Sequence, residues 1–455
     1  MPKTDQVQFK LTKEFLDDIR EAIHQGSEVE IERLLKDVHP ADIADVLDQV
    51  SLEEAKFIYK TLEDDRASDT LMELEDEVRN RFIKSLSNKE IAEQIEQMDS
   101  DDAADLIGEL SEADQEEVIQ QIEDKDIVEE VIDLLNYDED SAGGLMQKEY
   151  FKAKADAKVS DTVVELRKQA EEIKSVYSIY VVNEEDKLVG VLPLKQLIFT
   201  SPNSLVSDKM ISQNIKYAKV NTPNVEVADM MEKYDLVALP VVDLAGRLVG
   251  RITIDDVVDI IKEEADRDYQ LASGISENVE PTSSILKQTR SRLPWLVIGM
   301  LGGILGAQVI SQYEGEIALN PALAYFIPLI TAMGGNVGVQ SSAIVVQGLA
   351  NHTIQIGGIL PKVAKETAVG LINGIICSVL VFGISYMISE DHQLGLTVSL
   401  ALLTVILIAG IMGTVTPLML NRFKIDPALA TGPFITTVND VLGLFIYFVI
   451  GLLIY

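Results

Sequence analysis

One carboxylate interrupts the apolar segment at the end of the chain. Residues 431–455 read TGPFITTVNDVLGLFIYFVIGLLIY, and Asp440 is their only charged residue. A charged side chain at the centre of a bilayer costs roughly 3 kcal/mol on insertion scales, and such residues usually mark ion pathways. A divalent cation between two such carboxylates, one from each of two copies of the chain, would offset this cost. The segment therefore predicts a cation pathway that crosses a membrane.

Uncharged oxygen ligands accompany this acid on two apolar segments. If residues 433–447 form a helix, one face contains Pro433, Thr436, Thr437, Asp440 and Tyr447. The amides within 331–347 likewise share a face, at spacings of four and seven. Mg2+ prefers oxygen ligands and retains several of its waters. A zinc or copper cage is not expected, because Cys377 stands alone and the four histidines lie outside these stripes. The candidate pore ligands are Asp440, Asn439, Thr437, Thr436, Pro433, Asn336 and Gln340.

The two polar segments also resemble each other. NPALAYFIPLIT at 320–331 is similar to DPALATGPFIT at 426–436. When Pro328 is aligned on Pro433, Asp440 falls opposite Gly335. Inverted repeats are common in transporters, and their ion sites lie where Gly or Pro interrupts corresponding helices. A match this short can also arise by chance. Its aligned positions nevertheless lie beside the polar residues of both segments.

Five stretches are long and apolar enough to cross a bilayer, which takes about 20 residues. The loops between them alternate between basic and acidic, and basic loops mark the cytoplasmic side. This alternation predicts a multi-pass protein of the cytoplasmic membrane with its N-terminus in the cytosol and its C-terminus outside. The alternative interpretation is a set of buried helices in a soluble protein. The predicted spans are 293–312, 321–349, 366–389, 394–420 and 427–455.

The rest of the chain is strongly acidic. Only seven of the 74 Asp and Glu residues and six of the 38 Lys and Arg residues come after residue 288. Such a region should attract metal cations and repel nucleic acid, so we expect divalent cations and no nucleic-acid partner. The first ten residues lack the apolar core of a signal peptide, which predicts that this region stays in the cytosol. We do not expect an enzyme, because we find no nucleophile with a base and no phosphate loop.

The acidic region has two parts, and both contain repeats. Residues 1–138 have apolar residues three and four apart, and HPADIADVLDQVS at 39–51 recurs as DSDDAADLIGELS at 99–111. This pattern predicts an array of short helices. In the second part, YVVNEEDKLVGVLPLKQL at 180–197 matches PVVDLAGRLVGRITIDDV at 240–257. Each copy is a strand, a polar turn, a second strand and a helix, which resembles a tandem pair of CBS domains.

The CBS resemblance implies a nucleotide site. In such pairs a Thr-x-x-Asp after the second strand often holds a ribose. The second copy has this motif as Thr253 and Asp256, whereas the first copy has Pro193 and Gln196. Binding of an adenine nucleotide is one interpretation of the motif, and a helix cap is the other.

A run of acids at 255–268 continues towards the first span. A charge run is commonly a solvated helix face, but this one lies where movement of the soluble part would be transmitted. The expected fold class is therefore a multidomain α and α/β protein with a polytopic α-helical membrane domain. The expected parts are a helical N domain at 1–138, CBS domains at 139–203 and 204–261, a connecting helix at 262–288 and a membrane domain at 289–455.

Together these features resemble the MgtE family of magnesium channels and transporters, over the whole chain. The most specific feature is Pro433-x-x-x-Thr437-x-x-Asp440, which is similar to the family's Pro-x-x-x-Thr-x-x-Asp signature in its last span. The resemblance implies a homodimer that imports Mg2+ through a pore between its subunits, lined by the second and fifth spans. It also implies closure of the pore by intracellular Mg2+ bound to the cytosolic domains, with ATP at the CBS pair as a candidate modulator.

Electrostatics gives a physical reason for such a gate. Like charges about 4 Å apart repel by roughly 4 kcal/mol at an effective dielectric near 20, so acidic domains should separate when metal is scarce. Bound cations would convert this repulsion into bridges and favour a compact, closed state. The expected pairings, which contain all the candidate regulatory ligands, are Asp101 and Asp105 with Asp255 or Asp256, Asp235 with Asp259, and Asp426 with Glu263, Glu264 or Asp268.

Two other functions fit the sequence. The same site could carry another divalent cation such as Co2+ or Mn2+. From a different class, the chain could be a membrane-anchored nucleotide sensor, although an anchor has no need of Asp440, Asn336 and Gln340 within the bilayer. Whether transport is by a channel or by a coupled carrier stays open.

Overall fold

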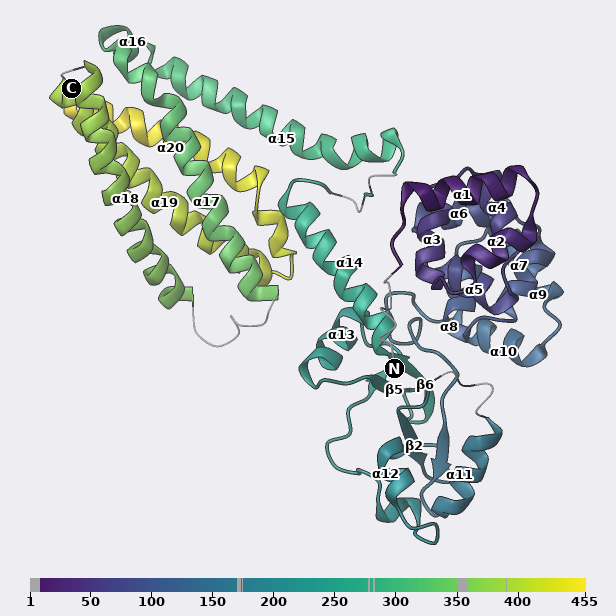
Figure 1. Cartoon of the computed structure of the whole chain (residues 1–455). Helices are drawn as coiled ribbons and strands as arrows, with labels where there is room; N and C mark the ends of the chain where they lie inside the picture. The colour runs from purple at the N-terminus through teal and green to yellow at the C-terminus, as the bar shows by residue number, and fades with distance from the viewer. Residues whose placement is uncertain are drawn as a thin grey trace, which may run out of the picture. The chain divides into compact units, whose positions relative to one another are not determined.

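The computed structural model describes residues 9–169, 173, 175–276, 279–280, 283–350, 359–389 and 391–455. The first eight residues, on which the signal-peptide prediction partly rests, lie outside this description. The chain forms two compact units, one that ends at Lys262 and one that begins at Glu263. Figure 1 shows the helices and strands of each unit.

The N domain is an array of short helices, as the repeats predict. Two of its helices begin with a capping box, in which Ser51 or Ser87 and the glutamate three residues later satisfy each other's backbone N–H groups. The two repeat copies bury equivalent positions: Leu47 and Ile107 are both at most 3% exposed. The helices are α1 (Lys13–His24), α2 (Glu28–Leu35), α3 (Pro40–Asp48), α4 (Leu52–Tyr59), α5 (Asp64–Met72), α6 (Asp76–Ile83), α7 (Asn88–Ile95), α8 (Ser100–Gly108), α9 (Glu112–Gln121) and α10 (Lys125–Leu134).

Two three-stranded sheets follow, each with one parallel and one antiparallel pairing. The first has the order β1-β2-β3 and the second the order β4-β5-β6. Each hairpin is followed by a helix, which confirms the predicted CBS pair. The elements are β1 (Lys152–Lys154), α11 (Val159–Lys168), β2 (Ser178–Val182), β3 (Leu188–Pro193), α12 (Leu194–Phe199), η1 (Val206–Asp208), β4 (Ala218–Lys219), α13 (Asn224–Lys233), β5 (Ala238–Val242) and β6 (Leu248–Thr253).

The two sheets repeat each other in register. Val181 pairs with Gly190 in the first hairpin and Val241 pairs with Gly250 in the second, and each hairpin has an irregularity directly after its valine. The hairpin turns also meet, through a bridge between Lys187 and its counterpart Arg247. Residues sixty positions apart therefore lie together, as expected for two copies related by an approximate two-fold axis.

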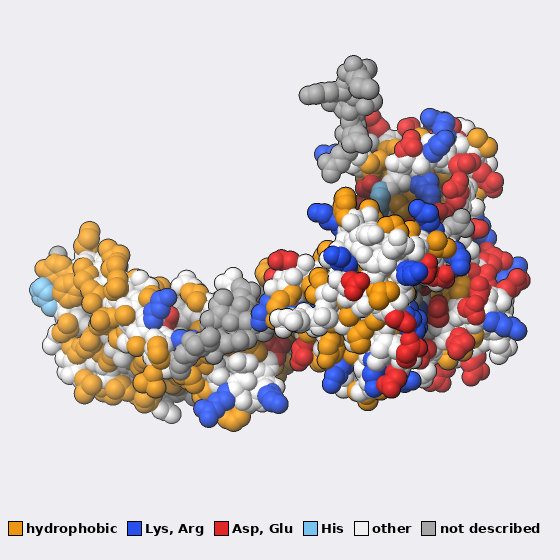
Figure 2. Space-filling view, turned by 90° about the horizontal axis from the view of Figure 1, so that it is seen from below, with side chains coloured by type: hydrophobic (Ala, Val, Ile, Leu, Met, Phe, Trp, Pro, Cys, Tyr) orange, Lys and Arg blue, Asp and Glu red, His pale blue; other side chains and the backbone are white. Residues whose placement is uncertain are grey.

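The remaining helices include five that are long and apolar enough to cross a membrane. They match the five predicted spans in number and order, and Figure 2 shows hydrophobic side chains spread over the surface of this part of the chain. The elements are α14 (Ile254–Ala272), α15 (Ile285–Gln312), α16 (Glu314–Leu319), η2 (Pro321–Phe326), α17 (Ile327–Ala350), α18 (Ile359–Ser389), α19 (His392–Arg422), η3 (Pro427–Ala430) and α20 (Pro433–Ile454).

Two predicted boundaries need correction. The segment 262–288 is not one connecting helix, because α14 ends at Ala272 and Gly274 has a φ of 79°, which a helix cannot continue through. The fifth span starts as a helix at Pro433 and not at residue 427, because Gly432 has a φ of 54°. A Cβ on Gly432 would lie 2.2 Å from the carbonyl oxygen of Ala272, so only glycine fits there.

Helix α19 forms the centre of the membrane unit and is the most buried of the five long helices. It packs against α17, α18 and α20, while α15 packs along α20 (Figure 1). Small residues allow these close approaches: a Cβ on Gly413 of α19 would lie 2.4 Å from the carbonyl oxygen of Gly338 in α17. Such glycine contacts are typical of helix packing in membranes, where backbones must approach closely.

Candidate functional site

Asp440 lies against the glycine-rich face of α17. A Cβ on Gly335 would be 3.5 Å from Oδ1 of Asp440, and one on Gly338 would be 2.0 Å from Nδ2 of Asn439. The glycines of the sequence GGNVG therefore leave room for the polar residues of α20. Gly335 is also the residue that the repeat alignment places opposite Asp440, so the two aligned positions are neighbours in space.

The other polar residues near the start of α20 have different neighbours. Thr436 donates a hydrogen bond from its hydroxyl to the carbonyl oxygen of Gly432 at 3.0 Å. Thr437 faces α15, where its methyl group occupies the space that a Cβ on Gly302 would need. Asn439 is 2% exposed, and its Nδ2 has no hydrogen-bond partner within the described part of the chain. Pro433 starts the helix and packs on Gly274.

The two amides predicted to join this site lie elsewhere on α17. Asn336 and Gln340 are exposed on the surface of the single chain, whereas Gly335 and Gly338 face α20. Successive residues of a helix are rotated by about 100°, so the amide stripe and the glycine stripe point in different directions. The single chain therefore brings Asp440, Thr436 and Asn439 together, but Asn336 and Gln340 do not join them.

A second membrane-domain carboxylate escaped the sequence analysis. Ser341 of α17 donates a hydrogen bond to Oε1 of Glu366 in α18 at 2.5 Å. Gly410 of α19 leaves room for this carboxylate, since a Cβ there would lie 3.3 Å from the same oxygen. The available signal was an acid at the start of an apolar stretch, whereas Asp440 was identified as an acid inside one.

In the unit that ends at Lys262, Asp101 connects the N domain to the CBS pair. It is 7% exposed and accepts a hydrogen bond on Oδ2 from Nε2 of Gln147 at 3.0 Å. The Oε1 of Gln147 in turn accepts from Nε of Arg251 at 2.8 Å, and the same two residues form a backbone bridge. Beside it, Ser100 donates from its hydroxyl to Glu149 at 2.8 Å. Helix α8 is thus held to the CBS pair by side chains whose pairing the sequence did not predict.

The charge of Asp256 acts on Asp101 across this contact, and these two acids are one of the expected pairings. Burial and the Asp256 charge raise the pKa of Asp101 well above its ordinary value. Burial raises the pKa of Asp256 to about 7, and the charges of Asp255 and Asp102 act in the same direction. Ionised carboxylates are therefore disfavoured here, and a cation would relieve both of them.

The other predicted regulatory acids are spread along α14 and beyond. Asp259 acts on Glu73, whose pKa is raised by burial and by this charge, so Glu73 is a neighbour that the sequence did not reveal. Burial and the Asp426 charge raise the pKa of Asp268, and this juxtaposition is again an expected one. The charge of Asp255 acts on Asp256, and that of Glu264 acts on Asp268, so these two acids lie near the pairs. The remaining predicted acids are exposed: Asp105, whose charge acts on Arg79, Asp235 in an exposed turn, and Glu263.

Metal-ligating side chains do not gather into larger groups. Among the described residues, no three His, Cys, Asp or Glu side chains are close enough to hold a metal ion together. Mg2+ retains several waters and is often bound by one or two carboxylates, so paired acids are compatible with it.

The Thr-x-x-Asp motif functions as a helix cap in this structure. Thr253 is 4% exposed, and its hydroxyl donates to Oδ2 of Asp256 at 2.8 Å. The charge of Asp256 also acts on Asp101. Nucleotide binding at Thr253 and Asp256 stays a prediction.

The fold and the site define a class of protein: a multi-pass membrane protein with a carboxylate among its spans, joined to an acidic helical domain and a CBS pair. Three family models match these parts. They are described as a divalent cation transporter at residues 327–450, an MgtE intracellular N domain at 38–140, and CBS domains at 142–202 and 206–263.

Known proteins identify the family. The chain is 36% identical over 315 residues to the magnesium transporter MgtE of Bacillus subtilis, covering 69% of this chain and 70% of the relative. It is 35% identical to the magnesium transporter MgtE of Thermus thermophilus, over 69% of this chain and 70% of that one. A crystal structure of the cytosolic domain of the Mg2+ channel MgtE in complex with ATP matches 54% of this chain and 99% of that one, with 32% identity and a TM-score of 0.51. The chain belongs to the MgtE family.

Proposed function

We propose that this protein carries Mg2+ across the cytoplasmic membrane. The observation that supports this most is Asp440, an acid on a membrane-spanning helix, placed against the glycine face of α17 together with Asn439. Carboxylate and amide oxygens suit a partly hydrated Mg2+ ion, and the relatives that resemble this chain are named magnesium transporters. In a homodimer, two copies of Asp440 and of the exposed amides Asn336 and Gln340 would line one pathway.

Intracellular Mg2+ closes this pathway in our proposal. The supporting features are the acid pairs Asp101 with Asp256, Glu73 with Asp259, and Asp268 with Asp426. Each pair is destabilised by burial or by repulsion when no cation is present. Mg2+ bound between the acids would stabilise the contacts that hold the cytosolic segments together.

ATP binding by the CBS pair stays a prediction. It rests on the similar cytosolic domain whose crystal structure contains ATP. A nucleotide that used Asp256 in this chain would have to break the Thr253 hydrogen bond and displace the contact with Asp101, so binding there would compete with docking of α8.

The decisive experiment is Mg2+ flux into liposomes that contain the purified chain. Wild type should carry Mg2+, and Asp440→Ala should reduce the flux to less than about a tenth, because it removes the carboxylate that compensates ion desolvation. Asp391→Asn is the matched control, since this acid caps α19 outside the span and should leave most of the flux. Raising Mg2+ on the cytosolic side should inhibit wild type.

Two outcomes would contradict the proposal. Full flux through Asp440→Ala would place the pathway elsewhere, and no flux through wild type would favour the membrane-anchored sensor. Faster flux of Co2+ or Mn2+ than of Mg2+ would assign the same site to another divalent cation.

A further inference from the structure

The first turns of α15 extend beyond the part of the helix that a bilayer core can cover. The helix runs from Ile285 to Gln312, and 28 residues at a rise of about 1.5 Å each give a length of about 42 Å. The hydrocarbon core of a bilayer is about 30 Å thick, which corresponds to about 20 residues. Lys287, Arg290 and Arg292 are the only charged residues of α15, and charged side chains avoid the core. The residues that lie outside the core are therefore those at the start of the helix.

A kink separates these turns from the rest of the helix. Pro294 lies inside α15, and a proline within a helix removes a backbone hydrogen bond and kinks the helix. Figure 1 shows a bend near the start of α15. Residues 285–293 can therefore lie along the membrane surface while the rest of the helix crosses the core.

One side of these turns is apolar and exposed. Ile285 and Leu286 are 86% and 80% exposed, and Leu293 is 53% exposed. With a rotation of about 100° per residue, these three side chains fall within an arc of about 100°. Leu296, which is 67% exposed and lies beyond the kink, falls in the same arc. The apolar side of the first turns therefore continues the side that the membrane-spanning part exposes to lipid.

The opposite side of these turns is held by the protein itself. Ser291 is fully buried there, and its carbonyl oxygen accepts a hydrogen bond from the backbone N–H of Ser276 at 2.9 Å. A Cβ on Gly274, which follows α14, would lie 2.6 Å from Cγ of Pro433 and 3.6 Å from Cβ of Trp295. The segment after α14, the start of α15 and the start of α20 thus pack together, which directs the apolar side of α15 outwards.

Basic side chains border this apolar side. By the same rotation, Arg292 lies at one edge beside Ile285, and Arg290 lies at the other edge beside Leu286, with Lys287 beyond it. All three basic side chains are exposed, and α15 contains no acid. Short amphipathic helices of this kind lie in the interface of anionic membranes. Each cation near the surface strengthens this attraction by about fivefold.

We propose that residues 285–293 bind anionic phospholipids of the leaflet from which the first span starts. The exposed apolar side chains contact the acyl chains, and the basic side chains donate hydrogen bonds to the phosphates of the headgroups. A zwitterionic lipid would cover the apolar side equally well, so the three cations select for the negative charge of the headgroup.

The test is quenching of a tryptophan by lipids with brominated acyl chains, with the full-length chain in vesicles. Trp295 is the only tryptophan of the chain, so Trp295→Phe with Leu293→Trp moves the reporter to the apolar side. Brominated phosphatidylglycerol should occupy this side at least about fivefold more tightly than brominated phosphatidylcholine, because its headgroup is anionic. The preference should fall to less than about twofold in about 1 M salt, where the Debye length is about 3 Å.

Neutralising the three cations in the same background should also reduce the preference to less than about twofold. The matched control neutralises three basic residues of α18 and α19 and should keep the full preference. The test variant is Lys287→Gln with Arg290→Gln and Arg292→Gln, and the control is Lys362→Gln with Lys365→Gln and Arg422→Gln. Circular dichroism would establish that each variant folds.

Three outcomes would overturn the proposal. Equal quenching by the two lipids would show that the headgroup charge is not recognised, and a preference that persists in the test variant would assign it to other residues. No quenching by either lipid would show that a second copy of the chain covers the apolar side. The measurement requires no ion flux, so this proposal and the function proposed above fail separately.

Discussion

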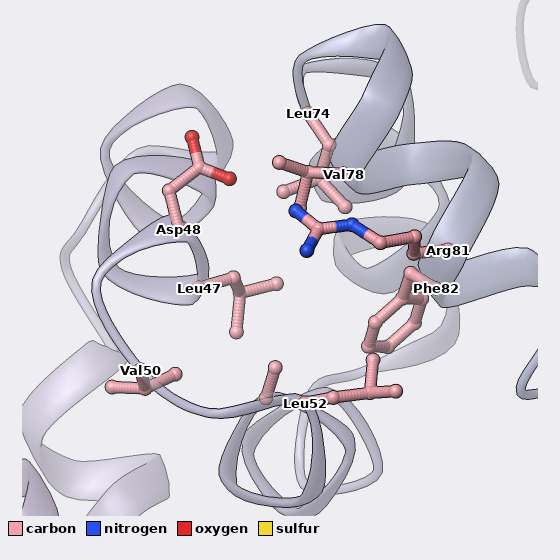
Figure 3. A pocket seen from close by; sticks show the side chains of 9 residues that line it. Leu47, Asp48, Val50, Leu52, Leu74, Val78, Arg81 and Phe82 are labelled. Atoms are coloured by element: carbon pink, nitrogen blue, oxygen red, sulfur yellow. The ribbon is translucent and has the colours of Figure 1, made fainter. Parts of the chain in front are cut away.

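Three single carboxylates of this protein lie in unfavourable surroundings, which differ from one to the next. Asp440 lies on a membrane-spanning helix beside the backbone of α17, whereas Asp101 is buried at the contact between the N domain and the CBS pair. Asp48 borders a cavity (Figure 3), and its Oδ1 accepts no hydrogen bond from the residues that the structure describes. Burying a carboxylate without a compensating charge destabilises the folded state, so each is a place where a cation would be favoured.

The pH dependence of N-domain stability should reveal the state of Asp48. Its folded pKa of about 6 lies above the ordinary value of 3.8, so the folded state binds more protons between pH 4 and 6 and stability falls as the pH rises through this range. The full shift would correspond to roughly 3 kcal/mol, but partial exposure reduces the expected effect to about 1 kcal/mol.

Urea unfolding of the cytosolic unit, followed by circular dichroism at pH 5 and pH 7.5, would measure this effect. Asp48→Asn should be more stable than wild type at pH 7.5 and should lose part of the pH dependence. Asp37→Asn should behave like wild type. An equal pH dependence in Asp48→Asn and wild type would contradict the assignment.

Glycine positions decide how the helices of the membrane domain approach one another. The side of α17 that faces α20 contains Gly335 and Gly338, and Gly302 of α15 receives Thr437 in the same way. At these crossings a methyl group would push against a polar side chain of α20. The helix packing therefore fixes the position of Asp440, although none of these glycines can bind an ion through a side chain.

Gly338→Ala should reduce both stability and Mg2+ flux. Its Cβ would lie 2.0 Å from Nδ2 of Asn439, so α20 must shift or Asn439 must leave its buried position, at a cost of about 1–3 kcal/mol. Gly383→Ala in α18 is the control, because its Cβ would meet nothing within 4 Å in the single chain. Thermal unfolding in detergent and liposome flux are the measurements. Wild-type flux in Gly338→Ala would show that this contact does not position the site.

At the scale of the whole molecule, the N domain and the CBS pair meet through acidic side chains. The contact between α8 and the CBS pair contains Asp101, Asp102 and Asp256, and Arg251 reaches it through Gln147. Its stability should therefore depend on bound cations. This dependence is what would allow the cytosolic unit to sense Mg2+.

Neutralising both acids should remove this dependence. In wild type, Mg2+ should slow hydrogen exchange of α8 by at least about tenfold, whereas Asp101→Asn with Asp256→Asn should show less than about a twofold response, because amides neither repel nor bridge through a cation. Glu112→Gln with Glu116→Gln removes two exposed acids of α9 and should keep the wild-type response. A tenfold response that persisted in the double aspartate variant would exclude this pair as a sensor.

Features that depend on neighbours in the sequence could be predicted without the structure. The length of the apolar stretches predicted the five spans, and two similar hairpins sixty residues apart predicted the CBS pair. Both predictions rest on the composition and periodicity of short segments, which are local properties. Asp440 could also be identified from the sequence, because an acid in an apolar segment is recognisable without knowledge of its neighbours in space. The ends of helices were less certain, because a glycine with positive φ at 274 or 432 is required by the packing around it.

The pairing of side chains was decided by the tertiary structure. The hydrogen bond between Gln147 and Asp101 joins residues 46 positions apart, and that between Arg251 and Gln147 joins residues 104 apart. Glu73 beside Asp259, Ser341 on Glu366 and the cavity at Asp48 likewise depend on how distant helices cross. The type of each acid and its neighbours along the chain indicated which acids would be costly to bury. Only packing determined which of them share a site, since a shift of one residue along a helix turns a side chain by about 100°.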